Sequence, residues 1–332
     1  MQWWEAQSQP LTQLNRNRLR SRCNTEAGSL KTMQFYDAAP SHDLTYSDVF
    51  LVPSRSDVAS RLDVSLATDD GTGATIPLVS ANMNSVTGAR LAATMARRGG
   101  LGVLPQDMHL QDLDAAIRWV KDQPTIFDTQ LELTPDSKVA DALRLIPPLS
   151  GQGIVLRSAD GQYVGCLEAS ALATALSDAP LGDLLRGPIA SIDADDVTDP
   201  RTAFDLMVAA DLEFAPVMHH GEVIGTLSRK SALRATLYTP NLDGDGRLRV
   251  AAAIGINGDV GAKAKALVAA GVDTLVLDTA HGDQDAMMRA VATVAKLNLT
   301  RPLVAGNVVT ASAVRDLAAA GATIIKVGVG PG

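Results

Sequence analysis

The sequence predicts an α/β fold in which short parallel strands alternate with covering helices, as in a (β/α)8 TIM barrel. Segments that are apolar along their whole length alternate with segments of helical spacing, in residues 75–104 and again in 249–332. Strands that are apolar on both faces are typical of parallel sheets covered by helices. These strands also end in small or polar residues, and the carboxyl rim of the strands is where such barrels carry function.

The first stretch supplies two strands and one helix. Residues 75–83, TIPLVSANM, predict an apolar strand followed by small polar residues. Residues 88–100 have apolar residues at helical spacing and end in two glycines, which is a signal for the end of a helix. The apolar segment LGVL at 101–104 predicts the next buried strand. The predicted order is therefore strand, helix, strand.

The second stretch continues this order and brings the number of strand candidates to six. A closed barrel of this class has eight strands, and an open sheet leaves exposed edges and an unfilled interior. We therefore expect an incomplete, C-terminally truncated barrel that is poorly soluble and inactive alone. The further strands are expected at 249–255, 273–282, 302–308 and 322–332, and the helices between them at 259–271, 283–297 and 310–321.

An internal repeat lies between the two stretches. Residues 133–172 and 192–233 each read as an acidic turn, a helix, a strand, a hairpin turn, a strand and the start of a helix. GQYVG and GEVIG correspond, with Gly165 and Gly225 in matching positions. Two such copies are expected to pair and bury each other's apolar faces. The predicted domains are a first barrel part at 33–122, an inserted module at 123–240 and a second barrel part at 241–332.

Composition and charge exclude several classes of protein. Hydrophobic residues make up 46% of the 332 residues and charged residues 20%, which is typical of a soluble globular protein. The balance of 29 basic and 37 acidic residues argues against nucleic-acid binding, and no apolar run approaches the roughly 20 residues of a membrane span. Two cysteines, far apart, favour a cytoplasmic location. Residues 1–32, rich in Gln, Asn and Arg, predict a disordered or misassigned extension.

Seven motifs follow one another along the chain: HDLTYSDVFLVP, IPLVSANM, GGLGVLPQDM, GRLRVAAAIG, DTAHG, AGNV and KVGVGPG. In this order they resemble those of the IMP dehydrogenase and GMP reductase family, nearest its actinobacterial branch of IMP dehydrogenase-related GMP reductases. The repeat resembles a tandem cystathionine-β-synthase (CBS) module, which this family carries inserted in its barrel. The resemblance implies an oxidoreductase that acts at C2 of a purine monophosphate with NADPH or NAD, as a homotetramer or octamer.

The resemblance also implies a cofactor site and a cation site. Asp278 matches the residue that contacts the nicotinamide ribose, and a carboxylate at a strand end is a good acceptor for two ribose hydroxyls. Carbonyls of Gly330 and Gly332 match ligands of a monovalent cation, K⁺, because glycine lets the backbone approach an ion closely. The cofactor-binding positions are Asp278, Thr279, Ala280, Gly328, Val329 and Gly330.

The implied purine site is formed by SANM and AGNV. Ser80, Asn82 and Met83 would line the purine pocket, and Asn307 would face it. By itself Asp278 could cap the following helix, and a Gly-rich turn is often no more than a turn. The set of motifs in this order favours a site instead. We therefore expect Asp278, Asn307 and Gly328 to lie around the opening of one binding site.

The catalytic nucleophile is expected outside this sequence. In the family, a cysteine within three residues of the Gly-rich turn adds to C2 of the nucleotide, and hydride moves between that carbon and the nicotinamide. The sequence places this cysteine beyond Gly332. Cys23 lies in the N-terminal extension, and Cys166 lies in the repeat, where a small buried apolar residue is expected. Neither can replace the nucleophile, so no catalytic residue is assigned.

Two reactions fit the resemblance, and the sequence favours one. GMP reductase converts GMP to IMP with NADPH, whereas IMP dehydrogenase converts IMP to XMP with NAD. Asn82 before Met83 is closer to GMP reductases, which favours NADPH-dependent reductive deamination of GMP. The inserted module is less common among GMP reductases. Pro105 and Gln106 stand where a His-Lys pair is usual, so the chain has no lysine at that position.

A function of another class is a nucleotide-sensing CBS protein without catalysis. CBS modules commonly hold an adenine-nucleotide ribose with an Asp that follows Ser or Thr. Ser170 and Ser231 occupy the corresponding positions here, which favours a packing role over ATP sensing. The adjacent His219 and His220 are expected at a solvated hairpin tip.

Overall fold

The computed structural model describes residues 41, 44, 46–50, 52–53, 55–187 and 189–328. The chain forms two compact units, Met1–Ser65 and Leu66–Gly332. In the first unit the structure describes two short 3-10 helices, η1 (Tyr46–Asp48) and η2 (Arg61–Asp63). The predicted extension at 1–32 lies outside the described residues.

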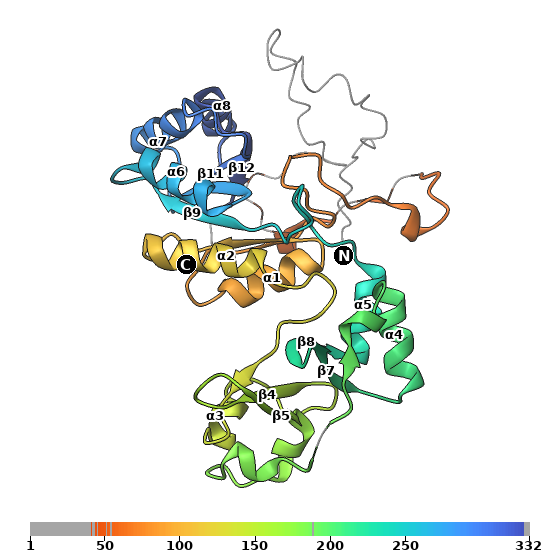
Figure 1. Ribbon diagram of the computed structural model, residues 1–332. Coiled ribbons are helices and arrows are strands. Elements are labelled where there is room, and N and C mark those ends of the chain that lie inside the picture. Colours follow the sequence, from red (N-terminus) through yellow and green to blue (C-terminus); the bar gives the residue numbers. More distant parts are fainter. Residues whose placement is uncertain are drawn as a thin grey trace. The chain divides into compact units, whose positions relative to one another are not determined.

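The second unit contains a six-stranded sheet in the order β1-β2-β9-β10-β11-β12, and every pairing in it is parallel (Figure 1). This confirms the predicted α/β class and the six strand candidates. The sheet curls into half a barrel, which is consistent with part of a TIM barrel. Its strands are β1 (Val79–Ser80), β2 (Leu101–Leu104), β9 (Ala251–Gly255), β10 (Thr274–Asp278), β11 (Leu303–Val308) and β12 (Ile324–Val327).

Five helices accompany these strands in the sequence. Four of them, α1, α6, α7 and α8, start and stop within three residues of the predicted positions. Helices α6 and α8 end in left-handed glycines, Gly271 and Gly321. Their apolar faces and the sheet share one core, in which residues such as Leu104, Ala252 and Leu277 are fully buried. The helices are α1 (Ala89–Arg97), α2 (Leu110–Lys121), α6 (Val260–Ala270), α7 (Asp285–Ala295) and α8 (Ala311–Ala320).

Strand β1 is shorter than the predicted segment 75–83. The backbone N–H groups of Thr75 and Ile76 both donate to the carbonyl of Gly99, at 2.8 and 3.2 Å, instead of forming a ladder. Regular pairing with β2 is limited to Val79 and Ser80. Because both N–H groups donate to the same carbonyl, residues 75–78 form a loop that leads into β1 and not part of the strand.

The repeat forms two three-stranded sheets with the same connectivity. In each sheet the first strand is parallel to the second, and the second forms an antiparallel hairpin with the third. The helix that follows the second copy is regular, whereas the one after the first copy is a 3-10 helix, η3 (Ala169–Thr174). The elements are β3 (Glu132–Leu133), α3 (Val139–Leu143), β4 (Gly153–Arg157), β5 (Tyr163–Glu168), β6 (Ile192–Asp193), α4 (Pro200–Ala209), β7 (Phe214–His219), β8 (Glu222–Ser228) and α5 (Arg229–Leu237), with 3-10 turns η4 (Leu181–Leu184) and η5 (Ala194–Asp196).

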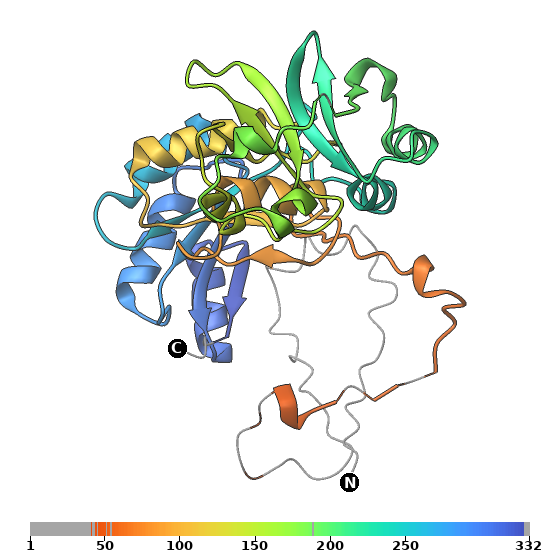
Figure 2. The same ribbon diagram turned by 90° about the horizontal axis from the view of Figure 1, so that it is seen from below.

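The two copies pack against each other through one small apolar cluster. Val155 and Cys166 of the first copy meet Phe214 and Val223 of the second, which confirms the predicted pairing of the copies. Figure 2 shows the yellow-green strands of the first copy beside the teal strands of the second. The Phe214 ring lies so close to Gly153 that a Cβ there would approach it to 2.2 Å. Glycine is therefore required at this contact.

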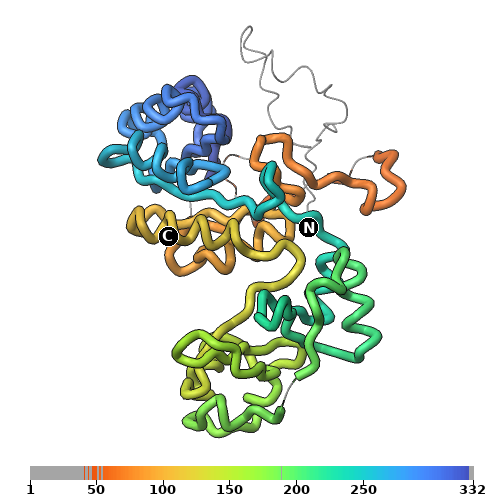
Figure 3. The backbone as a smooth tube through the Cα atoms, viewed as in Figure 1, coloured from red at the N-terminus to blue at the C-terminus, as the bar shows by residue number. Residues whose placement is uncertain are grey.

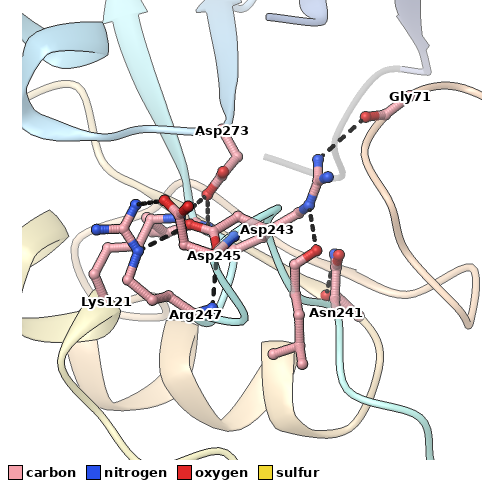
Figure 4. Close-up of polar contacts among 11 residues, drawn as sticks. Gly71, Lys121, Asn241, Asp243, Asp245, Arg247 and Asp273 are labelled. Carbon is pink, nitrogen blue, oxygen red and sulfur yellow. Dashed lines mark hydrogen bonds and ion pairs between the residues drawn. The ribbon is translucent and has the colours of Figure 1, made fainter.

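The two ends of the repeat segment are joined by polar contacts of Lys121, Asp243 and Asp273, which we call the neck. The chain leaves after α2 and returns before β9, as the tube in Figure 3 shows. Lys121, at the end of α2, donates from Nζ to Asp243 at 2.9 Å and to Asp273 at 2.6 Å (Figure 4). Nearby, the backbone N–H of Asn241 donates to the Ala96 carbonyl at 2.8 Å. Residues before and after the repeat are thus bonded directly to each other.

Candidate active site

A row of four residues crosses four neighbouring strands at the carboxyl edge of the sheet. In the parallel register, Gly255 of β9 lies opposite Asp278 of β10, Asp278 lies opposite Gly306 of β11, and Gly306 lies opposite Lys326 of β12. The two charged side chains are therefore separated by a strand that carries no side chain at that level. This leaves room for them to meet over Gly306.

Asp278 stands at the centre of a polar cluster that spans the curled sheet. Lys326 Nζ donates to Asp278 Oδ1, and Asn82 Nδ2 donates to Asp278 Oδ2 at 2.9 Å. Lys326 Nζ also lies 3.3 Å from Asn82 Oδ1. Asn82 follows the first strand of the sheet order and Lys326 lies in the last, so the cluster joins residues from both outer strands. The cluster brings together Asn82 and Asp278, which the sequence assigned to substrate and cofactor.

The loop after β1 holds the other residues predicted to line a purine. Thr87 Oγ1 donates to the Ala81 carbonyl at 2.5 Å and lies 2.9 Å from Ser80 Oγ. Thr87 is buried, so these bonds fix the path of the loop from inside. Met83 is 57% exposed, which leaves its side chain free to cover a ligand.

Thr279 and Asn307 tie the ends of β10 and β11 together. The backbone N–H of Asn307 donates to the Thr279 carbonyl at 2.9 Å, and the N–H of Thr279 donates to the Gly306 carbonyl at 3.0 Å. The Asn307 carbonyl accepts from the N–H of Gly282 at 2.7 Å. Asn307 Oδ1 is buried and has no hydrogen-bond partner within the described structure. A buried amide oxygen without a partner is costly, so this acceptor is suited to a ligand donor.

Gly328 follows β12 at the same edge of the sheet. Its N–H donates to the Val308 carbonyl at 3.0 Å, and its φ of 139° lies in the region that favours glycine. Asp278, Asn307 and Gly328 thus lie at the carboxyl ends of three adjacent parallel strands, on one rim. Ala280 lies in the loop after β10. The remaining predicted positions, Val329, Gly330 and Gly332, lie outside the described residues.

Gln106 supplies a second unpartnered acceptor at this rim. It follows β2, and its Oε1 is buried without a hydrogen-bond partner in the described part of the chain. The same atom lies 3.3 Å from the position that a Cβ on Gly255 would take. Pro105, just before it, is buried. Gln106 therefore presents an amide, not an ammonium, close to the row that contains Asp278.

The described cysteine is unsuited to nucleophilic chemistry. Cys166 lies in β5 of the repeat, is 2% exposed and forms part of the apolar contact between the copies. Burial raises the pKa of the Cys166 thiol to about 12, so it carries almost no thiolate at neutral pH. The prediction that Cys166 is a small buried apolar residue is confirmed. Cys23 lies outside the described residues.

The repeat carries a cleft of about 940 Å³ lined by both copies and by α1. Ser231 lies in its wall, but its hydroxyl is engaged locally: it accepts from the Ser228 N–H at 2.9 Å and reaches the Ser228 carbonyl at 3.0 Å. These bonds form the N-terminal cap of α5. Ser170 is exposed in η3. At the hairpin between β7 and β8, His219 lies 3.4 Å from Asp195.

Comparison with known proteins identifies the family. The model of the IMP dehydrogenase / GMP reductase domain matches residues 43–332. The chain belongs to this family. A GMP reductase of Mycobacterium tuberculosis is 47% identical over 307 residues, which cover 90% of this chain and 62% of the relative. An inosine-5'-monophosphate dehydrogenase of Staphylococcus saprophyticus is 35% identical over 302 residues, 87% of this chain and 60% of the relative. The chain thus spans about three fifths of the length of these family members.

Solved structures of the family agree with the fold. A GMP reductase variant from Trypanosoma brucei has 27% sequence identity and a TM-score of 0.51, with 89% of this chain and 68% of that chain covered. The same variant was also solved with guanosine 5'-monophosphate, with a TM-score of 0.50, 27% identity, and 89% and 64% coverage. These two structures therefore share the α/β fold of this chain.

Sequence reasoning left Lys326 and Gly306 without a role. Lys326 is a single charged residue within the otherwise apolar strand IIKV, and a lone charge in such a strand is a signal that could have found it. Gly306 gives no such signal, because its importance depends on the register of three strands. Among the described residues, no group of three or more His, Cys, Asp or Glu side chains could hold a metal ion. None of the helices in that part of the chain is long and apolar enough to span a bilayer.

Proposed function

We propose that this chain forms part of an NADPH-dependent GMP reductase, which converts GMP to IMP in purine salvage. The observation that carries the proposal is the contact of Asn82 with Asp278 at 2.9 Å, because it joins the proposed purine and nicotinamide positions at one rim. The 47% identity to mycobacterial GMP reductases supports this reaction over that of the dehydrogenases, which are 33–36% identical. IMP dehydrogenase, with IMP and NAD, is the alternative.

The proposed roles follow the chemistry of the side chains. The Asp278 carboxylate would accept hydrogen bonds from the nicotinamide ribose, beside Thr279, Ala280 and the Gly-rich turn Gly328–Val329–Gly330. Ser80, Asn82, Met83 and Asn307 would bind the purine nucleotide. The unpartnered Oδ1 of Asn307 and Oε1 of Gln106 fit ligands that carry N–H or O–H donors, as a purine and a carboxamide do. Carbonyls of Gly330 and Gly332 are proposed as ligands of K⁺.

The proposed reaction is balanced by one hydride and two protons. GMP, NADPH and two protons give IMP, NADP⁺ and an ammonium ion, with the C2–N bond broken and a C2–H bond formed. The nicotinamide supplies the hydride when it is bound. The residues of this chain would hold the two ligands side by side and exclude water from the rim. Cys166 has no part in the proposal, because it is buried in the repeat.

We further propose that residues 123–240 are a tandem CBS module inserted between barrel parts 33–122 and 241–332. The common connectivity of the two three-stranded sheets supports this assignment. The Ser231 hydroxyl accepts from the backbone N–H of Ser228, the N-cap residue of α5, and this engagement supports a packing role over ATP sensing. Calorimetric titration of the whole chain with ATP and with GTP would test this point, and binding in the cleft would favour the sensor alternative. The family assembly proposed is a cytoplasmic homotetramer or octamer.

The test of the proposed function is calorimetric titration of the 332-residue chain with GMP, IMP, NADPH and NAD, singly and as the pairs GMP–NADPH and IMP–NAD. We expect GMP and NADPH to bind, and Asp278→Asn to weaken NADPH binding while the variant still unfolds in a cooperative thermal transition. Preferential binding of IMP and NAD would favour the dehydrogenase. Binding of none of the four ligands would overturn both.

A further inference from the structure

Helix α1 begins where the loop proposed to bind the purine ends. Its N-cap residue, Gly88, directly follows residues 80–87, which we call loop 80–87. The buried Thr87 closes this loop, since its N–H donates to the Met83 carbonyl at 3.0 Å and its Oγ1 donates to the Ala81 carbonyl at 2.5 Å. The position of α1 therefore fixes one end of a loop that carries proposed ligand contacts.

The same helix is bonded to residues 124–130, the linker that leads into the first copy of the repeat. Arg90, in the first turn of α1, donates to two successive backbone carbonyls of this linker. Its Nη1 donates to Gln130 at 2.6 Å and its Nη2 donates to Thr129 at 3.1 Å. A guanidinium presents its donors in a fixed planar geometry, so two bonds to adjacent carbonyls fix both the position and the direction of the linker.

Two further arginines on the same face of α1 extend this contact. Arg97 donates from Nε to the Pro124 carbonyl and from Nη2 to Thr129 Oγ1, both at 2.7 Å. Arg98 Nη2 lies 3.3 Å from Asp128 Oδ1. These two residues follow the first arginine by about two helical turns, so all three side chains reach the same linker. We call the three arginines the arginine clamp.

The arginine clamp contains a buried charge that is costly to maintain. Arg97 is 2% exposed, and its Nη1 is buried without a hydrogen-bond partner in the described part of the chain. Burial lowers the pKa of the Arg97 guanidinium to about 10, although the charge of Asp128 acts in the opposite direction. An apolar residue of similar volume is often at least as stabilising as a buried charge. The conserved geometry of the linker, and not stability, is therefore the property that this arginine best explains.

The linker and the returning segment connect α1 to the repeat itself. Asp128 exchanges two backbone hydrogen bonds with Thr226 of β8, at 2.8 and 2.9 Å. After the repeat, the N–H of Asn241 donates to the carbonyl of Ala96, in the last turn of α1, at 2.8 Å. Side chains of α1 also line the cleft of the repeat. One helix thus contacts loop 80–87 at its amino end and both connections to the repeat along its length.

We propose that α1 is a coupling helix, in which the hold of the arginine clamp on the linker determines how well loop 80–87 is ordered. A linker released from the arginine clamp leaves the first turn of α1, and with it Thr87, less restrained. A displacement of the repeat therefore reaches the loop without any direct contact between them. Arg90 is a positioning residue in this proposal and binds no ligand. The inference rests on the proposed function only for the identity of the ligand that the loop binds.

The test is amide hydrogen exchange of the 332-residue chain without ligand, measured by mass spectrometry at pH 7. We expect Arg90→Met to raise the exchange rate of the amides in loop 80–87 by about tenfold, as for the loss of a charge-assisted hydrogen bond. Arg90→Lys, which can still donate to one carbonyl, should give a smaller rise. Exchange in α7 should stay unchanged in both variants. Arg315→Met, on the exposed face of α8, is the matched control and should change neither region.

A variant on the linker side keeps the test decisive if Arg90→Met does not fold. Asp128→Ala removes the carboxylate that faces Arg98 and should raise exchange in loop 80–87 in the same direction. The coupling is overturned if exchange in the loop is unchanged in every variant that folds. A rise of equal size in the loop and in α7 would show a role in global stability alone, which also overturns it. If the chain binds no GMP, the proposed function fails, whereas the exchange rates still decide this inference.

Discussion

Lys121 Nζ donates to Asp273 Oδ2 at 2.6 Å, and the two side chains are 4% and 1% exposed. The same ammonium contacts Asp243 at 2.9 Å, and Asp273 Oδ2 also accepts from the Val250 N–H at 2.9 Å. One lysine at the end of α2 thus serves two carboxylates at the amino end of the sheet. In barrels of this class that end contributes to stability, whereas the opposite rim carries chemistry.

Lys121→Met is expected to lower the free energy of unfolding by roughly 3 to 5 kcal/mol, because it leaves the buried charge of Asp273 without its partner. Urea unfolding at pH 7 measures the change. Arg118→Met is the matched control: it breaks an i,i+4 pair with Asp114 on the exposed face of the same helix and should change stability little. Equal effects of the two substitutions would contradict the assignment of Lys121 as the central cation of this network.

Asp243 should contribute stability that depends on pH. Burial by itself would raise the pKa of this carboxyl, but hydrogen bonds from Lys121 and from the Arg247 backbone N–H, with the charge of Lys121, lower it to about 2. The folded pKa is below the unfolded value near 3.9, so the stabilisation is present above pH 4 and is lost as the pH falls towards 2.

Asp243→Asn should therefore cost about 2 kcal/mol at pH 7 and progressively less below pH 4. Urea unfolding of the chain and the variant, at pH 7 and at pH 3, measures both differences. A cost that stays constant between the two pH values would show that the effect comes from packing and not from the charge.

Gly306→Ala is expected to destabilise the fold by about 1 to 3 kcal/mol, because the added methyl group collides with the Lys326 backbone. The chain should still fold, with β11 and β12 displaced from each other. Gly244→Ala is the control, because a Cβ at Gly244 meets no atom within 4 Å. Thermal unfolding distinguishes the two variants, and similar midpoints would contradict the close approach of Lys326 to Gly306.

Cys166 should be unreactive while the chain is folded. With its pKa raised to about 12, roughly one thiol in ten thousand is ionised at pH 8, and the sulfur is buried between the two copies of the repeat. In a Cys23→Ser background, an aromatic disulfide reagent at pH 8 should modify Cys166 only after urea is added. Rapid modification of the folded chain would show that the contact between the copies opens readily.

Much of the sheet could be predicted from the sequence, because its strands are apolar on both faces and short. The segments 101–104 and 302–308 are too short for a typical helix and are apolar on both faces, which favours a covered strand. Helix α2 was not predicted, although Leu113, Ile117 and Val120 have helical spacing and are buried. Its exposed face is strongly polar, so the apolar stripe is narrow in the sequence.

The candidate site could be predicted only in part, because motifs name residues but not contacts. Asp278 and Asn82 were assigned from DTAHG and SANM, each to a different ligand. That they touch depends on the curl of the sheet, which brings the loop after β1 to β10. The contact of Lys326 with Asp278 depends on the register across Gly306, and no local pattern encodes the register of three separate strands.

The neck formed by Lys121 and Asp243 has a consequence for how the chain could be re-engineered. The bond between these two residues joins the ends of the segment 123–240. The length of that segment therefore adds little to the entropy cost of pairing β2 with β9. A short glycine linker in place of residues 123–240 should leave the register of Val103 with Ala251 intact. A fluorescent protein or another folded domain could also be inserted between residues 122 and 241, in place of the repeat segment.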